Sequence, residues 1–463
     1  MRNRESLRFV LLIVAVATIG GFMFGYDSGA INGTQDGLRQ AFGLSDAGLG
    51  LTVSALLPGA ALGAFLAGRL ADLWGRRRVM MLSAFLFIIT AIASGAATSA
   101  AVLVVARFLA GAAVGAASVL SPAYISEVTP AAVRGRLSSM QQVMIITGLT
   151  GAFLANFALA ATAGSSLGAL WGGHAAWRWM FWVQALPALL FLLTLSLIPE
   201  SPRFLVARRR MDEAERVLTR LFGAGEAKAK LGEIAASLDS DRRPSLADLR
   251  QAGGGWRPII WVGIGLAVFQ QFVGINVVFY YGAVLWQAVG FSEADALKIN
   301  ILSGTVSILA CLVSISVIDR IGRRPLLLLG SAGMTVTLAT LAWCFAQADT
   351  SAGAVQLPPG VGVAALLAAN AYVIFFNLSW GPVMWVMLGE MFPNQIRGSA
   401  LAVAGAAQWL ANFAVSSSFP WLASQVGLPV TYGAYAGFAL LSFLFVRTAV
   451  RETRGIELED MQG

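Results

Sequence analysis

The chain has 463 residues, of which 57% are hydrophobic and only 12% are charged. Soluble proteins carry about twice that share of charged residues, so the composition excludes an ordinary soluble domain. The 50 glycines suit closely packed membrane helices, and the alternating, turn-punctuated strands of an outer-membrane barrel are absent from the sequence. We therefore expect an all-α membrane protein.

Apolar stretches near the ~20 residues needed to cross a membrane follow one another along the chain. We predict twelve spans, at 8–31, 48–70, 79–98, 101–121, 138–161, 177–198, 258–287, 296–318, 325–347, 362–388, 398–421 and 429–450. With both termini in the cytoplasm, all Lys and Arg residues fall in cytoplasmic segments except Arg39, Arg178, Lys298 and the intramembrane Arg107. This positive-inside bias explains the net charge of +8 without a nucleic-acid partner, and it predicts a multi-pass inner-membrane protein.

The longest hydrophilic segment separates six spans from six. Its stretch MDEAERVLTRLF has apolar residues at helical spacing, which predicts short amphipathic helices on the cytoplasmic face. We therefore expect an N-terminal six-helix bundle at 1–200, a cytoplasmic linker at 201–257, and a C-terminal six-helix bundle with a short tail at 258–463.

Three motifs occur in the same order in both halves of the chain. DLWGRRR begins at Asp72 and DRIGRRP at Asp319, while EVTPAAVRG begins at Glu127 and EMFPNQIRG at Glu390. PESPR, which ends the first bundle, is echoed by RETRG near the C-terminus. Parallel repeats about an axis normal to the membrane are typical of one large class of transporters.

Longer motifs carry a family resemblance that extends over essentially the whole chain. GRLADLWGRRR, PESPR, FQQFVGINVVFYY, SWGPVMWVMLGEMFPNQIRG and AQWLANF together resemble the sugar-porter family of the major facilitator superfamily. Within that family the chain resembles the bacterial proton–sugar symporters of the xylose, galactose and arabinose type. The resemblance implies two six-helix bundles around a central cavity, alternating access, and a hexose or pentose bound near the middle of the membrane.

Amide and aromatic side chains gather in the predicted helices one, five, seven, ten and eleven. Amides both donate to and accept from sugar hydroxyls, and an aromatic ring suits the C–H face of a sugar. The residues alone leave open whether these amides bind a sugar or join helices to one another. The resemblance implies sugar contacts at Gln142, Gln270, Gln271, Asn276, Trp385, Gln408 and Trp409, with Phe24 and Tyr280 as aromatic contacts.

Local features refine this predicted sugar site. Asn412 lies one turn after Gln408 on the same helix face and joins the candidates. Gly274 is expected to loosen helix seven, and helix ten is expected to break at Gly381-Pro382. Ser307 stands where the family often has an asparagine, which leaves the identity of the sugar open.

Asp27 lies in the apolar stretch FMFGYDSGAI, where an ionised carboxylate is costly. Either it follows the end of the first helix in a loop, or it binds something that crosses the membrane. It is the only acid well inside a predicted span, Arg107 is the only base, and the two can pair. The resemblance implies that they form the proton-coupling pair; a static ion pair is the alternative. Gln184 replaces an acid found in one proton-coupled relative.

A cytoplasmic gate is the third predicted site. The repeated E-x-x-P-x-x-x-R-G motif places acids and bases at matching helix ends of both halves. We expect them to form an acid–base lattice that bridges the bundles while the cytoplasmic side is closed. Its members are Glu127, Arg134, Glu390, Arg397, Arg76, Arg323 and Glu200.

These features predict a secondary transporter that imports a monosaccharide with a proton. A facilitative sugar uniporter and a non-transporting sugar sensor remain the alternatives. Neither a nucleotide-binding Gly-Lys-Ser motif nor a zinc-ligand spacing occurs, so we expect no enzyme activity, no metal and no cofactor. The expected partners are the sugar, the proton and the lipid bilayer, with the monomer as the functional unit.

Overall fold

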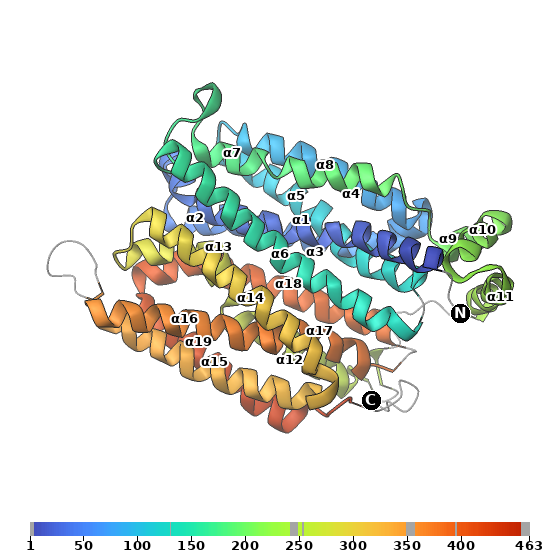
Figure 1. Cartoon of the computed structure of the whole chain (residues 1–463). Coiled ribbons are helices and arrows are strands. Elements are labelled where there is room, and N and C mark those ends of the chain that lie inside the picture. The colour runs from blue at the N-terminus through green and yellow to red at the C-terminus, as the bar shows by residue number, and fades with distance from the viewer. Residues whose placement is uncertain are drawn as a thin grey trace.

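The computed structural model describes residues 4–129, 131–240, 249–251, 254–348, 357–393 and 396–454, with the side chains of 4–7, 131–139, 237–240 and 359 excepted. This part of the chain is almost entirely helical (Figure 1). It contains 12 helical spans that are long and apolar enough to cross a membrane, which confirms the predicted twelve.

The N-terminal half and the linker account for the first eleven α-helices. They are α1 (Arg4–Phe42), α2 (Asp46–Ser54), α3 (Leu56–Trp74), α4 (Arg76–Gly95), α5 (Ala100–Val128), α6 (Ala131–Ala163), α7 (Ala176–Trp182), α8 (Ala185–Leu195), α9 (Pro202–Ala207), α10 (Met211–Phe222) and α11 (Ala224–Ser240). A short 3-10 helix, η1 (Trp171–Gly173), lies between α6 and α7. The C-terminal half holds α12 (Pro258–Phe272), α13 (Ile275–Ala288), α14 (Glu293–Ile321), α15 (Arg323–Ala346), α16 (Pro359–Leu378), α17 (Trp380–Met391), α18 (Arg397–Gln425) and α19 (Leu428–Ala449).

Each half packs its six spans in the same way. In the N-terminal half, α1 packs on α6, α3 on α5, and α4 on α8; in the C-terminal half, α12 packs on α18, α14 on α16, and α15 on α19. These pairs occupy equivalent places in the order of spans, so the repeated motifs correspond to a repeated helix arrangement. The halves meet where α6 packs on α14, α18 on α2 and α3, and α1 on α13.

Two of the spans that contribute to the predicted sugar site are interrupted. Gly274 separates α12 from α13 with a φ of 81°, a left-handed conformation that glycine adopts without strain, as the sequence predicts. The break in the tenth span lies at Ser379, between α16 and α17, and not at Gly381-Pro382 as expected. Pro382 lies within the first turn of α17, where proline is tolerated because the first N–H groups of a helix have no partner inside it.

The linker helices lie against the N-terminal half. Both ends of the described chain and α9–α11 lie at the same end of the molecule, which we call the linker end (Figure 1). The opposite end, where α1 finishes and α14 begins, is called the far end. As predicted, α10 is amphipathic: Ala214, Leu218 and Leu221 are buried. The Arg220 guanidinium lies 4.0 Å from the centre of the Phe9 ring and links α10 to α1.

Candidate functional site

Asp27 lies in the middle of α1, so the alternative of a loop position after the first helix is excluded. Its Oδ1 lies 2.7 Å from an Nη1 donor of Arg107 in α5, and both side chains are 2% exposed. A buried ion pair of this kind is held together strongly, because separating the partners leaves an uncompensated charge in the interior. Two of their atoms, Asp27 Oδ2 and Arg107 Nε, have no hydrogen-bond partner among the described residues. Asp27 Oδ2 can therefore bind water or a proton, and Arg107 Nε can donate a hydrogen bond to water.

Asp27 is not the only acid in its helix. Because α1 continues to Phe42, beyond the predicted end at residue 31, Asp36 also lies within this span. Its Oδ2 accepts a hydrogen bond of 3.0 Å from the side-chain amide of Gln287 in α13. Asp36 is thus engaged with the opposite half, whereas Asp27 is paired inside its own half.

Four of the predicted sugar-binding amides form one chain of hydrogen bonds. Gln270 Oε1 accepts from Gln271 at 3.1 Å and from Gln408 at 2.9 Å. Gln271 Oε1 accepts in turn from Asn276 at 2.5 Å. The break at Gly274 brings Asn276 back toward Gln271, and α18 contributes Gln408. The structure therefore brings together amides from two spans, with donor and acceptor directions fixed by their neighbours.

The chain of amides is anchored to the interrupted tenth span. Gln270 Nε2 donates 2.9 Å to the carbonyl oxygen of Trp380, the first residue of α17. The Trp380 indole is fully buried and donates to the Ser331 hydroxyl at 2.9 Å, and that hydroxyl also lies 2.8 Å from Ser442. The broken span is thereby held in place by α15 and α19.

Aromatic and amide candidates from α1, α13 and α18 also meet. The Phe24 ring contacts the Trp409 ring edge-to-face, with centroids 5.6 Å apart. The buried Tyr280 hydroxyl interacts with the side chains of Asn412 and Ser28. Asn412 Oδ1 accepts a hydrogen bond of 2.9 Å from Ser416. One turn of α1 thus contacts residues of the predicted sugar site.

Two candidates are not joined to this set by a described contact. Gln142 in α6 is half-buried and Trp385 in α17 is 39% exposed. Neither has a hydrogen bond or ring contact to the other candidates among the described side chains. Their role in sugar binding stays a prediction. At Ser307, where the family often has asparagine, Asn377 in α16 supplies an amide that donates 3.2 Å to the serine hydroxyl.

Buried amides at the far end were missed by the sequence reasoning. Asn32 and Gln35 of α1 donate to the backbone carbonyls of Phe279 and Tyr280, and Asn300 of α14 donates 2.8 Å to Asn32. These hydrogen bonds join the two halves. The only sequence signal for them is that Asn32 and Gln35 follow Asp27 by one and two turns in an otherwise apolar helix.

At the linker end, the repeated motifs build the same polar network in each half. In the N-terminal half, Arg76 lies 3.0 Å from Asp72 and 3.3 Å from Glu127. Glu127 also accepts from the Ser201 hydroxyl, and Glu200 accepts from the Arg77 N–H at 3.1 Å.

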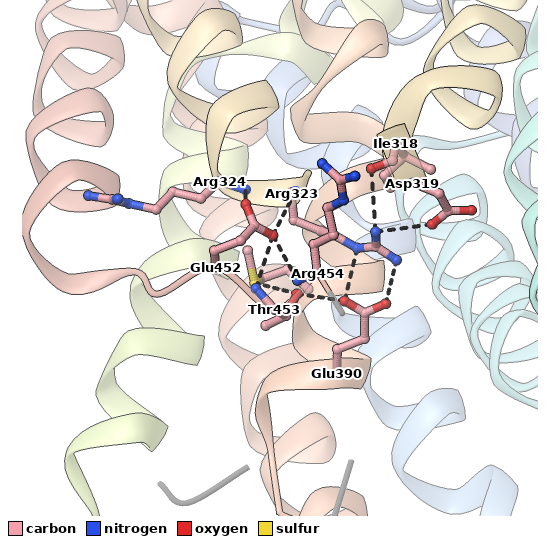
Figure 2. A network of polar contacts seen from close by, with 9 residues as sticks. Ile318, Asp319, Arg323, Arg324, Glu390, Glu452, Thr453 and Arg454 are labelled. Atoms are coloured by element: carbon pink, nitrogen blue, oxygen red, sulfur yellow. Dashed lines mark hydrogen bonds and ion pairs between the residues drawn. The ribbon is translucent and has the colours of Figure 1, made fainter. Parts of the chain in front are cut away.

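The C-terminal half repeats this pattern at equivalent positions (Figure 2). Arg323 lies 3.0 Å from Asp319 and 2.7 Å from Glu390, which accepts from the Thr453 hydroxyl at 2.6 Å. Glu452 accepts from the Arg323 and Arg324 N–H groups at 3.0 Å each. Although burial acts to raise the pKa of Glu452, hydrogen bonds from the backbone N–H groups of residues 323, 324, 453 and 454 hold it below its ordinary value.

The expected gate residues other than Arg134 are therefore at one end, but the described contacts of the three acids Glu127, Glu200 and Glu390 do not cross between the halves. Arg397 begins α18, and its Nε donates 3.1 Å to the carbonyl of Phe392. The side chain of Arg134 lies outside the described side chains. An acid–base lattice that bridges the halves stays a prediction for the conformation in which the cytoplasmic side is closed.

Comparisons with known proteins accord with this geometry. A protein-family model described as sugar (and other) transporter matches residues 13–463. The chain belongs to this family. A glucose transport protein of Synechocystis sp. is 47% identical over 461 residues, which are 99% of this chain and 98% of that protein.

Solved structures support the same assignment. A structure of the major facilitator superfamily proton:xylose symporter XylE, bound to 6-bromo-6-deoxy-D-glucose, matches with a TM-score of 0.81 and 36% identity over 98% of this chain and 99% of that one. The inward open conformation of XylE from E. coli matches with a TM-score of 0.83 and 35% identity over 98% and 99% of the two chains. The protein is therefore an integral membrane transporter with the major facilitator fold, not an enzyme.

Proposed function

We propose that the protein imports a monosaccharide together with a proton by alternating access. The amide chain at Gln270 suits a neutral, hydroxyl-rich ligand, since amides both donate and accept and place no net charge beside the sugar. The glucose transport protein at 47% identity and the proton:xylose symporter structure favour a hexose or a pentose.

The observation that carries the proton-coupled form of this proposal is the buried Asp27–Arg107 pair. A carboxylate in this position is stabilised by the guanidinium, whereas desolvation favours the neutral acid. If the pair separates in one conformation, the proton affinity of Asp27 differs between conformations. Proton and sugar then act on the same two-state equilibrium, and each changes the binding of the other by the same factor.

The position of α1 makes this coupling direct. The turn that carries Asp27 toward α5 also carries Phe24 against Trp409 and Ser28 against Tyr280. A movement of this turn that breaks the ion pair also displaces residues of the predicted sugar site. The proposed coupling between the proton site and the sugar site therefore needs no chain of intervening residues.

A facilitative uniporter is the second candidate function. It is favoured by the closed geometry of the Asp27–Arg107 pair, which a purely structural ion pair would also adopt. In that case the sugar gradient alone would drive transport. A sugar sensor that binds without transporting is the remaining alternative.

We further propose that the linker end faces the cytoplasm of an inner membrane, that residues 1–200 and 258–463 move as two units joined by 201–257, and that the monomer transports. The clustered arginines of α9 and α10 support this orientation through the positive-inside rule.

Uptake into proteoliposomes tests the proposed function. A panel of labelled hexoses and pentoses is offered with and without an imposed inward proton gradient, and then with a protonophore. Accumulation above equilibrium that needs the gradient is the expected result. Equilibration without accumulation would identify a uniporter, and saturable binding without uptake would identify a sensor.

A further inference from the structure

An apolar groove of about 400 Å³ lies on the outward face of the α4–α5 helix pair. Its lining residues belong to the last three turns of α4 and the first three turns of α5. Because α4 begins with Arg76 in the linker-end network, α4 ends and α5 begins toward the far end. The groove therefore lies in the part of these two spans that is nearest the far end.

Small residues form the floor of the groove and larger ones form its walls. On α4 the floor residue Thr90 is 2% exposed, whereas the neighbouring Ile89 is 47% exposed. On α5 the floor residue Ala106 is 5% exposed, and its neighbour Val105 is 59% exposed. Each helix thus places a large exposed residue beside a small buried one, and this pattern hollows the surface between them.

The side chains that line the groove offer no free hydrogen-bonding group. Thr90 is the only polar residue among the described ones that line it, and its hydroxyl donates 3.0 Å to the Phe87 carbonyl of its own helix. A sugar, an ion or an ordered water needs polar partners, so none of them suits the groove. Both helices belong to spans that are apolar enough to cross a membrane, so the groove opens onto lipid hydrocarbon.

The dimensions of the groove suit a hydrocarbon chain. Its volume is many times the ~30 Å³ share of one water molecule, and it lies within the range of ligand pockets, about 300–1,000 Å³. Along α5 the groove extends from Ala101 to Leu109, a length of about 12 Å at 1.5 Å per residue. Van der Waals attraction falls steeply across even a small gap, so an unfilled hollow of this length would forfeit contacts along both walls.

We propose that this groove binds one acyl chain of a phospholipid from the leaflet at the far end. A flexible chain can follow the groove along both helices and fill it. The bilayer is itself apolar, so the preference for the groove comes from packing and not from the hydrophobic effect. We therefore expect the groove to be occupied several-fold more than the rest of the lipid-facing surface. The inference goes beyond the proposed transport function and does not depend on it.

The groove and the buried ion pair lie on opposite faces of α5. Arg107 follows the wall residue Val105 by two positions, which is about 200° around a helix of 3.6 residues per turn. The Arg107 guanidinium bonds to Asp27 of α1, on the side facing the interior of the N-terminal half. A bound acyl chain therefore packs against the outer side of the α5 turn that holds Arg107.

Photo-crosslinking in proteoliposomes locates the bound chain. The probe is a phosphatidylethanolamine whose acyl chain carries a diazirine, and mass spectrometry of the digested full-length protein maps the labelled peptides. We expect labelling of residues 86–109 to be several-fold above that of other exposed lipid-facing segments, such as residues 430–444 of α19.

Two variants fill the groove from its two sides. Ala93→Phe adds a ring on α4 and Ala101→Phe adds one on α5, and either ring takes the place of the chain. The matched control is Ala434→Phe, the same change at an exposed alanine of α19. Labelling of residues 86–109 should fall several-fold in both groove variants and stay at the wild-type level in the control. Thermal unfolding in detergent verifies that each variant is folded, and two independent variants keep the test decisive if one is not.

Native mass spectrometry of the detergent-solubilised protein provides a second readout. With added phosphatidylethanolamine, the wild type and Ala434→Phe should retain one more lipid than either groove variant. Labelling spread over the lipid-facing surface in proportion to exposure, or equal labelling and lipid retention in the groove variants, would overturn the site. A dimer mass that disappears in the groove variants would assign the groove to a second copy of the chain and would also overturn it. These measurements need neither sugar nor a proton gradient, so their outcome is independent of the proposed symport.

Discussion

The two ends of the molecule hold their polar residues in different ways. At the far end, neutral amides of α1 bond across the interface to the backbone of α13 and to α14. At the linker end, arginines and carboxylates form networks that repeat in both halves, and the described contacts of Glu127 and Glu390 lie within each half.

This difference indicates what each end does in the conformation described here. At the far end hydrogen bonds join the two halves, while the described contacts of the linker-end acids stay within each half. Neutral amide bonds are insensitive to salt, whereas partly exposed ion pairs are screened by it. The two ends should therefore respond to different perturbations, and the Asp27–Arg107 pair lies between them.

The largest effect is expected from Asp27→Asn. The asparagine cannot exchange a proton, so uphill accumulation driven by a proton gradient should be lost, while sugar exchange across proteoliposomes persists. Asp36→Asn is the matched control in the same helix, because Asp36 bonds to Gln287 rather than to an arginine. Gradient-driven accumulation at the wild-type level in Asp27→Asn would leave the ion pair as a static element of the N-terminal half.

The next largest effect is expected at the middle of the molecule, from Gln270→Ala. It removes the oxygen that accepts from both Gln271 and Gln408 and leaves one buried and one half-buried amide without that partner. A loss of this kind costs about 1–3 kcal/mol, which corresponds to roughly a tenfold to hundredfold weaker sugar affinity. Titration calorimetry measures it. Asn370→Ala in α16 serves as control. Equal sugar affinities in the two variants would mean that the amide chain only packs the helices together.

A smaller effect is expected from Glu390→Gln and, separately, from Glu127→Gln. We propose that these acids bond across the halves when the linker end closes, so either change should lower that population several-fold. Labels on Arg78→Cys and Arg320→Cys, exposed in opposite halves, would show a longer mean separation at the linker end. Asp319→Asn, which pairs with the same arginine and is 80% exposed, is the control. If the distances between the labels match those of wild type or are shorter, Glu127 and Glu390 do not form a gate at the linker end.

The smallest effect concerns Glu452. Its pKa is held below the ordinary value, so its contribution to stability is present at neutral pH and is lost as the pH falls below about 4.5. Glu452→Gln should lower the unfolding temperature at pH 7, and the gap to wild type should narrow with acidification. Glu226→Gln, an exposed carboxylate of α11, should show no such gap. If the difference in unfolding temperature between Glu452→Gln and wild type does not change with pH, the effect comes from packing and not from the charge.

The sequence by itself determined the spans, the two halves and the repeated linker-end motifs. Hydrophobicity is a local property, so a run of apolar residues predicts a membrane helix wherever it occurs. The motifs at Asp72 and Asp319 could be matched because a repeated sequence folds into a repeated structure, and the two networks bond in the same way. The family resemblance singled out the amides of Gln270, Gln271 and Gln408 as candidates, and the structure joins them by hydrogen bonds.

Only the tertiary structure decided which partner each polar group takes. An asparagine in an apolar helix suits a sugar, a side chain of a neighbouring helix or that helix's backbone equally well, so Asn32 could not be assigned from its own sequence context. The break at Ser379 was also placed by packing, because Gln270 bonds to the Trp380 carbonyl and α15 holds the Trp380 indole. A hydrogen bond depends on distance and direction between residues far apart in the chain, and these are set only when the two halves meet.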